Sequence, residues 1–328
     1  MSNYWQVAAG SDSRDYSDVF LKYGLAFVGG ETQEATMKKV QPGDYMILKK
    51  GMSEVVAVGV VGQRGGKPRH KGDKRWLLDV DGWDLPAYCF VDWHKPSFSI
   101  NVTGLTRATL QMIWDPVIID AANLCVASFP VSPYEPEPMM PAKVEDEEII
   151  EFLVGKGLRV AAAEELTTTF RRIRRLAKYY KENVDWGDVR EHETRTFLIV
   201  PLLIALGWPE QSIKIEQPVP KGRVDLALFN GPYKGNPQEA QLLIETKGFA
   251  QGLSYAPGQA KGYADHYSNC KVIFVSNGYC YKAYVKEGKT YPDEPSAYLN
   301  ILDPRSAYPL NPKISGALEL LGLLLKTA

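Results

Sequence analysis

The sequence is poor in cysteine and histidine, with four of each among 328 residues. The cysteines are scattered and form no C-x-x-C pair, and the histidines do not cluster with them. Zinc sites and disulfide frameworks both need such clusters at regular spacing. The pattern therefore argues against either kind of site and indicates a reduced compartment.

Long apolar runs and an excess of charge are also missing, and we expect no signal peptide. No apolar run reaches the ~18 residues that a membrane span requires, and the opening Met-Ser-Asn-Tyr-Trp-Gln has neither the basic nor the apolar region of a signal peptide. The formal net charge of -1 gives no global basic excess that would point to nucleic acid, although it leaves local patches open. No Gly-x-x-x-x-Gly-Lys-Ser/Thr loop is present. We therefore expect a cytoplasmic protein with no membrane contact and no use of ATP.

The composition that remains is that of a soluble globular protein, with 45% hydrophobic and 23% charged residues. A length of 328 residues suits about two domains. The stretch 130–141 holds five prolines, which is typical of a semi-rigid, extended linker. We therefore predict a first domain at 1–129, a linker at 130–145 and a second domain at 146–328.

The first domain shows many short strand-like runs at close spacing. Strands are predicted at 4–8, 45–49, 55–63, 76–80 and 88–93, a helix at 32–40, and a last short element at 109–114. This pattern, with two small helices at most, predicts a small β-barrel with short helices.

The second domain mixes longer helices with strands. Helices are predicted at 145–153, 161–183, 189–206, 256–267 and 314–325, and strands at 213–217, 222–229, 241–247, 271–276 and 279–285. We therefore predict a mixed central sheet flanked by helices, so that the whole chain combines α+β and α/β character.

Two of these strands each carry a carboxylate. Asp225 lies in the first, and Glu245 in the second, where Lys247 follows two places later. Residues i and i+2 of a strand face the same way, so Glu245 and Lys247 should enter one site while Thr246 points away. If the strands pair as a hairpin, Asp225 joins them. Mg²⁺ prefers carboxylates, waters and phosphate oxygens, and water activated there can attack a phosphodiester.

Further polar residues accompany this group, and here the chain resembles the PD-(D/E)XK nuclease superfamily. The likeness runs over residues 191–284 and is nearest to the N-terminal nuclease domain of the R subunits of type I restriction enzymes. The matching blocks, in order, are Glu193-Thr194-Arg195, Pro201-Leu202-Leu203 with Leu206-Gly207-Trp208, Gly222-Arg223-Val224-Asp225, Ile244-Glu245-Thr246-Lys247, Gln259-Ala260-Lys261-Gly262-Tyr263 and Ser276-Asn277-Gly278. Any one block is common by itself, but six in order are specific.

The resemblance implies a metal-dependent nuclease centre. It implies that Asp225 and Glu245 bind Mg²⁺ together with the Thr246 carbonyl, with Mn²⁺ as a substitute ion. Lys247 is implied to orient the attacking water and to stabilise charge on the phosphoryl oxygens. The family's usual proline before the first acid is replaced by Val224, which removes no chemical group.

Three more residues receive roles from the same resemblance. Glu193, early on its helix, is expected near the metal shell. Gln259 and Tyr263 correspond to the family's Q-x-x-x-Y motif, and positions i and i+4 of a helix share a face, so both can support the site and the substrate strand.

Plainer explanations exist for each residue alone, such as a turn acid, a solvated ion pair or a helix-dipole acid. Their joint occurrence favours the nuclease centre. The basic face of the helix at 161–183 can follow DNA phosphates, but a solvated face or a dimer contact fits it equally well. This face comprises Arg171, Arg172, Arg174 and Arg175.

The first domain contains no catalytic cluster but is rich in aromatic residues. Trp83 lies in a turn-like context of polar and breaker residues, where a loop aromatic beside an acid suits stacking on an extruded base. The domain resembles the EVE/YTH-like branch of the PUA superfamily at Tyr4-Trp5-Gln6-Val7 and at residues 10–16, 24–28, 40–44 and 55–61. By position, the resemblance implies base-edge readers at Ser11, Asp12 and Ser13, and pocket walls at Phe27, Trp83 and Trp93. The family often has tryptophan near Phe27, and ordinary core or loop positions are the alternative for all three walls.

Together the two resemblances imply a modification-dependent DNA endonuclease. Its expected partner is double-stranded DNA with a modified base, a modified cytosine in the first instance, and analogy suggests a role in defence against phage. One active site cuts one strand, so we expect a homodimer. The sequence leaves open a nuclease of unmodified DNA or RNA, and also a non-catalytic nucleic-acid-binding or regulatory protein.

Overall fold

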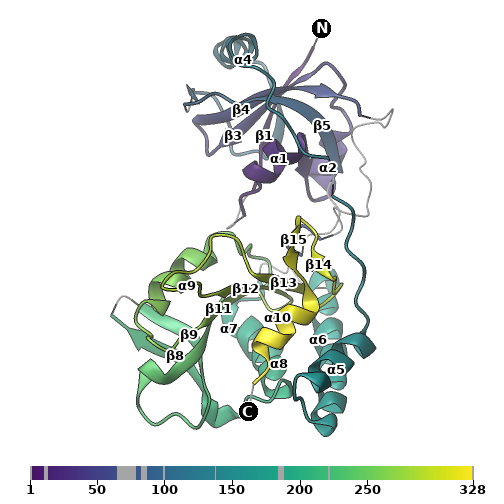
Figure 1. Ribbon diagram of the computed structural model, residues 1–328. Helices are drawn as coiled ribbons and strands as arrows, with labels where there is room; N and C mark the ends of the chain where they lie inside the picture. Colours follow the sequence, from purple (N-terminus) through teal and green to yellow (C-terminus); the bar gives the residue numbers. More distant parts are fainter. Residues whose placement is uncertain are drawn as a thin grey trace. The chain divides into compact units, whose positions relative to one another are not determined.

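The structure is a computed structural model that describes residues 2–10, 14–64, 79–82, 87–98, 100–136, 138–183, 188–220 and 222–326. The chain divides into two compact units, Met1–Met139 and Met140–Ala328. Each unit combines helices with a mixed sheet of its own (Figure 1). The predicted mixture of α and β structure is confirmed at this level.

The first unit is built on a curled sheet. Its strands are β1 (Tyr4–Ala8), β2 (Leu25–Val28), β3 (Tyr45–Lys50), β4 (Glu54–Gly62), β5 (Ala87–His94), β6 (Ile100–Asn101) and β7 (Leu110–Ile113). They are ordered β2-β5-β4-β3-β1-β7, with β6 paired to β4, and only β1 and β3 run parallel among these pairs. Over the described residues β2 and β7 remain ends of the ladder, so the expected small barrel is here a curled half-barrel (Figure 1). The strand predicted at 76–80 lies mostly outside the described residues.

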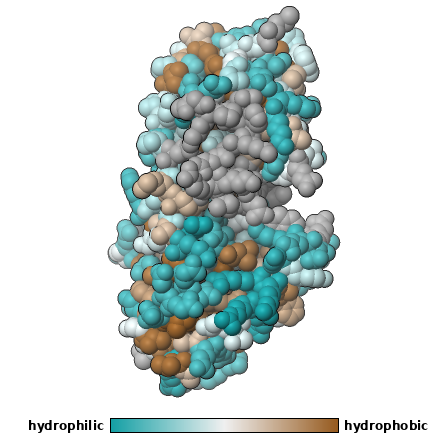
Figure 2. Space-filling model, turned by 90° about the vertical axis from the view of Figure 1, so that its right-hand side faces the viewer, coloured by the Kyte–Doolittle hydropathy of each residue, from teal (hydrophilic) through white to brown (hydrophobic). Residues whose placement is uncertain are grey.

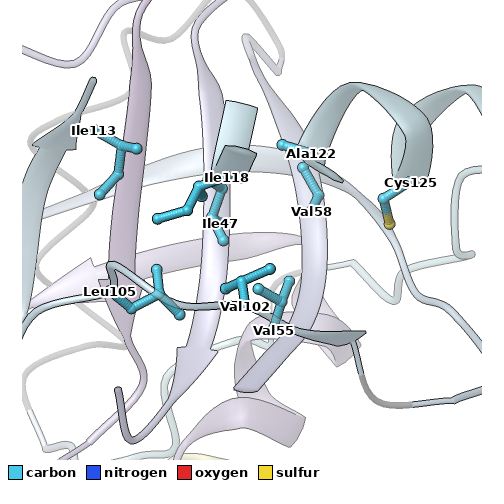
Figure 3. Packing of buried hydrophobic residues seen from close by; sticks show 9 residues of the cluster. All are labelled: Ile47, Val55, Val58, Val102, Leu105, Ile113, Ile118, Ala122 and Cys125. Carbon is cyan, nitrogen blue, oxygen red and sulfur yellow. The ribbon is translucent and has the colours of Figure 1, made fainter. Parts of the chain in front are cut away.

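Helices α1 (Ser17–Tyr23), α2 (Glu31–Met37) and α4 (Pro116–Ser128) accompany this sheet. Helix α4 was not predicted from the sequence. Its start signals are nevertheless present, because the Asp115 carboxylate accepts the Val117 N–H at 2.9 Å and proline occupies the first turn. The buried face of α4 packs on β3 and β4 and closes an apolar core (Figure 3). The core comprises Ile47, Val55, Val58, Val102, Leu105, Ile113, Ile118, Ala122 and Cys125.

The segment predicted as a linker is bound to a unit at each of its ends. The Ser132 N–H donates to the Trp93 carbonyl at 2.7 Å, within the first unit. The Val144 N–H donates to the Pro304 carbonyl at 2.9 Å, within the second. The boundary between the two compact units falls inside the predicted segment 130–145.

The second unit contains the longer sheet. Its strands are β8 (Ile213–Val219), β9 (Gly222–Phe229), β10 (Ala240–Thr246), β11 (Val272–Ser276), β12 (Cys280–Val285), β13 (Ala297–Asn300), β14 (Ala307–Tyr308) and β15 (Asn311–Ser315). The order is β14-β15-β13-β12-β11-β10-β9-β8, with β10 parallel to β11 and β13 parallel to β15. Strands β9 and β10 pair antiparallel, which is the condition under which Asp225 was predicted to join Glu245 and Lys247. Strands β13, β14 and β15 were not predicted, and the last helix is shorter than predicted because 311–315 joins the sheet.

The helices of the second unit are α5 (Asp146–Gly155), α6 (Val160–Asn183), α7 (Glu191–Thr194), α8 (Val200–Ala205), α9 (Ala256–Ala264) and α10 (Ala317–Leu324). A π-helical turn, η2 (Arg195–Ile199), joins α7 to α8. Helix α9 is the crossover between parallel strands β10 and β11 and packs on both, while α10 packs on β12, β13 and β15. No helix in the described part of the chain is both long enough and apolar enough to cross a membrane.

Candidate active site

The sheet of the second unit is interrupted at Asp225. The ladder between β8 and β9 is paired on both sides of the Glu216–Asp225 position but not at it. The ladder between β9 and β10 ends one residue away, at the pair Leu226 and Ile244. Glu216 also adopts a left-handed backbone conformation, with φ of 53°. Asp225 therefore lies where its strand loses regular pairing with both neighbours.

Donors on neighbouring elements hold the Asp225 carboxylate. Its Oδ2 accepts the backbone N–H of Thr246 at 2.6 Å and the Thr246 hydroxyl at 3.0 Å. Its Oδ1 accepts Nη1 of Arg195 at 3.1 Å. The expectation that the Thr246 side chain points away from the site is wrong. Because the ladder between β9 and β10 has ended, the Thr246 amide finds its acceptor in this carboxylate, which also receives the hydroxyl.

Glu245 and Lys247 meet in the same site, as expected of residues two apart on a strand. Lys247 Nζ lies 2.5 Å from Glu245 Oε1. The other oxygen of Glu245 is buried and has no hydrogen-bond partner. Burial, chiefly, and then the negative charge of Asp225 raise the pKa of Glu245 to about 7, against the opposing effect of Lys247. This carboxyl thus has an oxygen to spare for a cation.

Helix α9 extends the group through Gln259 and Tyr263. Gln259 Oε1 accepts from Lys247 Nζ at 3.3 Å, and Gln259 Nε2 donates to the Tyr263 hydroxyl at 3.0 Å. The hydroxyl in turn lies against Gly222, where an added Cβ would be 2.7 Å from it. A continuous hydrogen-bonded chain therefore runs from Glu245 through Lys247 to Tyr263.

Two acids lie at the start of helix α7, and they have different partners: Glu191 interacts with Asp225, whereas the predicted Glu193 bonds to its own helix. Glu193 is exposed, and its Oε2 accepts the N–H of Arg190 at 2.7 Å, so it caps the start of its own helix. Burial, then the negative charge of Asp225, raise the pKa of Glu191, while Lys247 opposes the rise, so Glu191 interacts with Asp225. Glu193 is the third residue of α7, and its side chain folds back onto the helix backbone. Glu191 is the first residue of α7, and its side chain is not used in this cap.

Arg195 was part of a matching block, but no role was predicted for it. It is 3% exposed, and its Nη2 donates to Glu216 Oε1 at 3.0 Å. Arg195 begins the π-helical turn η2, which precedes Pro201, a residue with no N–H for regular helical bonding. Its spacing of four from Glu191 is the signal that could have placed both on one helical face.

The turn between β11 and β12 fixes this helix against the sheet. Gly278 has φ of 95°, and a Cβ there would lie 2.6 Å from Leu198 Cδ1 and 2.8 Å from Thr194 Cγ2. The buried Asn277 accepts the Cys280 N–H at 3.0 Å and so shapes the turn. Only glycine permits both the left-handed backbone and this close approach.

The predicted basic face of α6 separates into two kinds of arginine. Arg174 is bound within its unit, with Nη1 on Asp146 Oδ2 at 2.8 Å and Nε on the Ile301 carbonyl at 2.7 Å. Arg171, Arg172 and Arg175 are exposed. Hydrophilic residues predominate on the face of the second unit that Figure 2 shows, with apolar residues between them. Contact with DNA phosphates remains a prediction, and Arg174 is the least available for it.

The predicted base-binding residues of the first unit are not seen together. Ser11, Asp12, Ser13 and Trp83 lie outside the described residues. Phe27 and Trp93 are 2% and 1% exposed. The Phe27 ring packs on Phe20 at 4.7 Å between centroids, and Trp93 Nε1 donates to the Leu25 carbonyl at 3.2 Å. Both behave as core side chains, and their role in base binding stays a prediction.

In the part of the chain that the structure describes, no three His, Cys, Asp or Glu side chains are arranged to hold a metal ion. The acids of the site are instead paired with Lys247 and Arg195. The donor set still suits Mg²⁺, because it offers hard carboxylate oxygens and includes the buried, unpartnered Oε2 of Glu245. The expected ligands Asp225, Glu245 and Thr246 therefore fit the ion chemically.

The chain matches no protein-family model and no curated protein. Among solved structures it is similar to the crystal structure of protein Atu2648 from Agrobacterium tumefaciens, with 15% sequence identity, a TM-score of 0.24, and coverage of 40% of this chain and 99% of that one. A likeness at this level supports no argument about the fold or function of this chain.

Proposed function

We propose that this protein is a Mg²⁺-dependent DNA endonuclease with a PD-(D/E)XK centre in its second unit. The observation that carries the proposal is the meeting of Asp225, Glu245 and Lys247 where the ladder between β9 and β10 ends. Charged groups are rarely buried in a sheet without a partner or a function. Two acids, a lysine and a spare carboxylate oxygen in one place are suited to metal-assisted hydrolysis.

The residues that would hold the ion are Asp225, Glu245 and the carbonyl of Thr246, with Glu191 as an adjacent carboxylate. A bound Mg²⁺ would offset the charge of a phosphodiester and activate water for attack. Glu245 must be ionised to serve as a ligand. Its raised pKa therefore couples cation binding to loss of a proton near neutral pH.

The other polar side chains of the site would position the substrate and stabilise charge on its phosphate. Lys247, held by Glu245 and Gln259, places an ammonium where it can stabilise charge on phosphoryl oxygens. Gln259 and Tyr263 fix the direction of Lys247 and offer polar groups to a substrate strand. The exposed arginines Arg171 and Arg172 are candidates for contacts with DNA phosphates.

The proposed task of the first unit is to choose the substrate. Its resemblance to EVE/YTH-like PUA domains supports base flipping and recognition of a modified base, with Trp83 as the main stacking residue. A curled half-barrel is compatible with such a domain. Because each centre cuts one strand, a double-strand break needs two copies, and we include a homodimer in the proposal.

Cleavage of matched plasmids tests both the Mg²⁺-dependent nuclease activity and the preference for a modified base. The substrates carry 5-methylcytosine, 5-hydroxymethylcytosine, glucosylated cytosine or no modification, each with Mg²⁺ and with EDTA. The proposal expects Mg²⁺-dependent cleavage of at least one modified plasmid and little of the plain one. Equal rates on all four would instead support a nuclease of unmodified DNA.

Two variants test the catalytic centre and the recognition of the modified base separately. Asp225→Asn keeps the side-chain shape and should abolish cleavage while DNA binding persists. Trp83→Ala should lower the preference for modified DNA and leave the Mg²⁺ requirement unchanged. Binding without cleavage in wild type, unaltered by Asp225→Asn, would favour a non-catalytic nucleic-acid-binding protein.

A further inference from the structure

A buried arginine lies beside the acid expected to hold the metal. The guanidinium of Arg195 donates to Asp225 Oδ1 at 3.1 Å through Nη1 and to Glu216 Oε1 at 3.0 Å through Nη2. It therefore bridges carboxylates from the adjacent strands β8 and β9, at the position that their ladder skips. Its side chain is 4% exposed, so water screens this charge poorly.

The contacts of Asp225 would place a bound cation near this arginine. Oδ2 already accepts two donors from Thr246, which fills its lone pairs. Oδ1 is then the oxygen with capacity for a cation, and it is the oxygen that Arg195 contacts. Two positive charges within a few ångströms repel each other strongly in a partly buried site.

Glu216 supplies the opposite charge. Hydrogen bonds with Arg223, first, and with Arg195 lower the pKa of Glu216, so it stays ionised over a wide pH range. Its backbone is left-handed, with φ of 53°, which is strained for a residue other than glycine. The conformation accompanies a carboxylate directed at the Arg195 guanidinium.

We propose that Arg195 is a positioning residue for Asp225, and that Glu216 strengthens divalent-cation binding at the site by offsetting the charge of Arg195. The proposal rests on the proposed function, because it takes Asp225 to be a metal ligand. It requires the two side chains to act in opposite directions. Loss of Glu216 leaves a guanidinium that opposes the cation, whereas loss of the Arg195 charge removes that opposition.

Calorimetric titration of the full chain with Mn²⁺, without DNA, measures this directly. We expect Glu216→Gln to weaken Mn²⁺ binding about tenfold and Arg195→Gln to tighten it about tenfold, a modest change for a buried charge near a divalent ion. Glutamine is shorter and carries no charge, and the two donors of Thr246 still orient Asp225 in this variant. In the Arg195→Gln background, the effect of Glu216→Gln should fall below about threefold, because no guanidinium is left to offset.

Arg223→Gln is the matched control. It removes the same charge from the protein, but Arg223 contacts Glu216 and is 67% exposed. Its effect on the Mn²⁺ affinity should stay below about threefold, as for other surface charges. If Arg223→Gln tightened binding as much as Arg195→Gln, the effect would be one of net charge and the inference would fail.

The remaining outcomes are also decisive. The inference would be overturned if Glu216→Gln and Arg195→Gln changed the Mn²⁺ affinity in the same direction. An unchanged Mn²⁺ affinity in Glu216→Gln would also overturn it. Glu216 is half-exposed, so its variant tests the idea even if Arg195→Gln does not fold. If Asp225→Asn abolishes Mn²⁺ binding but Glu216→Gln leaves it unchanged, only this inference is overturned and the proposed function stands. Absence of Mn²⁺ binding in wild type overturns the proposed function as well.

Discussion

The two units hold their predicted functional residues in different ways. In the second unit, Glu245, Lys247, Gln259 and Tyr263 form one hydrogen-bonded chain, and Thr246 holds Asp225 beside it. In the first unit, the two described members of the predicted base pocket are buried core residues. The difference has a physical cause. Buried charges need partners or a function, so a charged site stands out from a core, whereas aromatic side chains fill cores and stack on bases alike.

The largest effect should come from the polar group of the second unit. We expect Asp225→Asn and Lys247→Ala each to reduce the DNA cleavage rate by about 10³-fold, because each removes a charge that acts on the reacting phosphate. Single-turnover cleavage at saturating enzyme is the measurement. DNA binding by gel shift should stay within a few-fold of wild type, and an undiminished cleavage rate would show that the group is structural.

A core substitution in the first unit tests the other side of the comparison. Trp93→Ala should lower the free energy of unfolding by about 3–5 kcal/mol, since it removes a large buried side chain and its hydrogen bond to Leu25. Trp114→Ala is the control, because Trp114 is 76% exposed and its loss should change stability by less than about 0.5 kcal/mol. Denaturant unfolding measures both. A stable Trp93→Ala variant that loses preference for modified DNA would place Trp93 in a base pocket.

The raised pKa of Glu245 predicts a pH effect on stability without metal. Its pKa is about 7 in the folded chain, against 4.5 for an ordinary glutamate, so the folded state binds the extra proton between these limits. The free energy of unfolding should therefore fall as pH rises from about 4.5 to about 7 and level off above, by an amount on the order of 3 kcal/mol. Denaturant unfolding in EDTA across this range is the measurement. Glu245→Gln should flatten this slope, and an identical slope in both proteins would show that Glu245 is not its source.

The smallest predicted difference is between two acids in one turn of helix α7, Glu191 and Glu193. We expect Glu191→Gln to reduce cleavage about 10–100-fold, the range typical of residues beside a metal site. Glu193→Gln should stay within about threefold of wild type, because glutamine can still accept the backbone N–H in the capping position. Cleavage rates at several Mg²⁺ concentrations give the comparison. A larger loss of cleavage in Glu193→Gln than in Glu191→Gln would support the role near the metal that the sequence predicted for Glu193.

Much of this arrangement was predictable from local pattern. The meeting of Glu245 with Lys247 and the shared face of Gln259 and Tyr263 follow from strand and helix periodicity, whereas the pairing of β9 with β10 was only a condition at that stage. Periodicity is set by backbone geometry, so nearby residues reveal it without knowledge of the fold. Helix α4 also had readable start signals, although it was not predicted.

Other features depend on contacts between segments far apart in the chain. Whether Glu191 or Glu193 faces Asp225 was decided by how the turn at Gly278 seats helix α7 against the sheet. The bridge from Arg195 to Glu216 requires a skipped ladder position between β8 and β9. Strand register and helix orientation come from packing in three dimensions, where a one-residue change redirects a side chain. The order of residues along the chain is enough to say which chemical groups are present and which pairs share a face, but which of them meet depends on how distant segments pack.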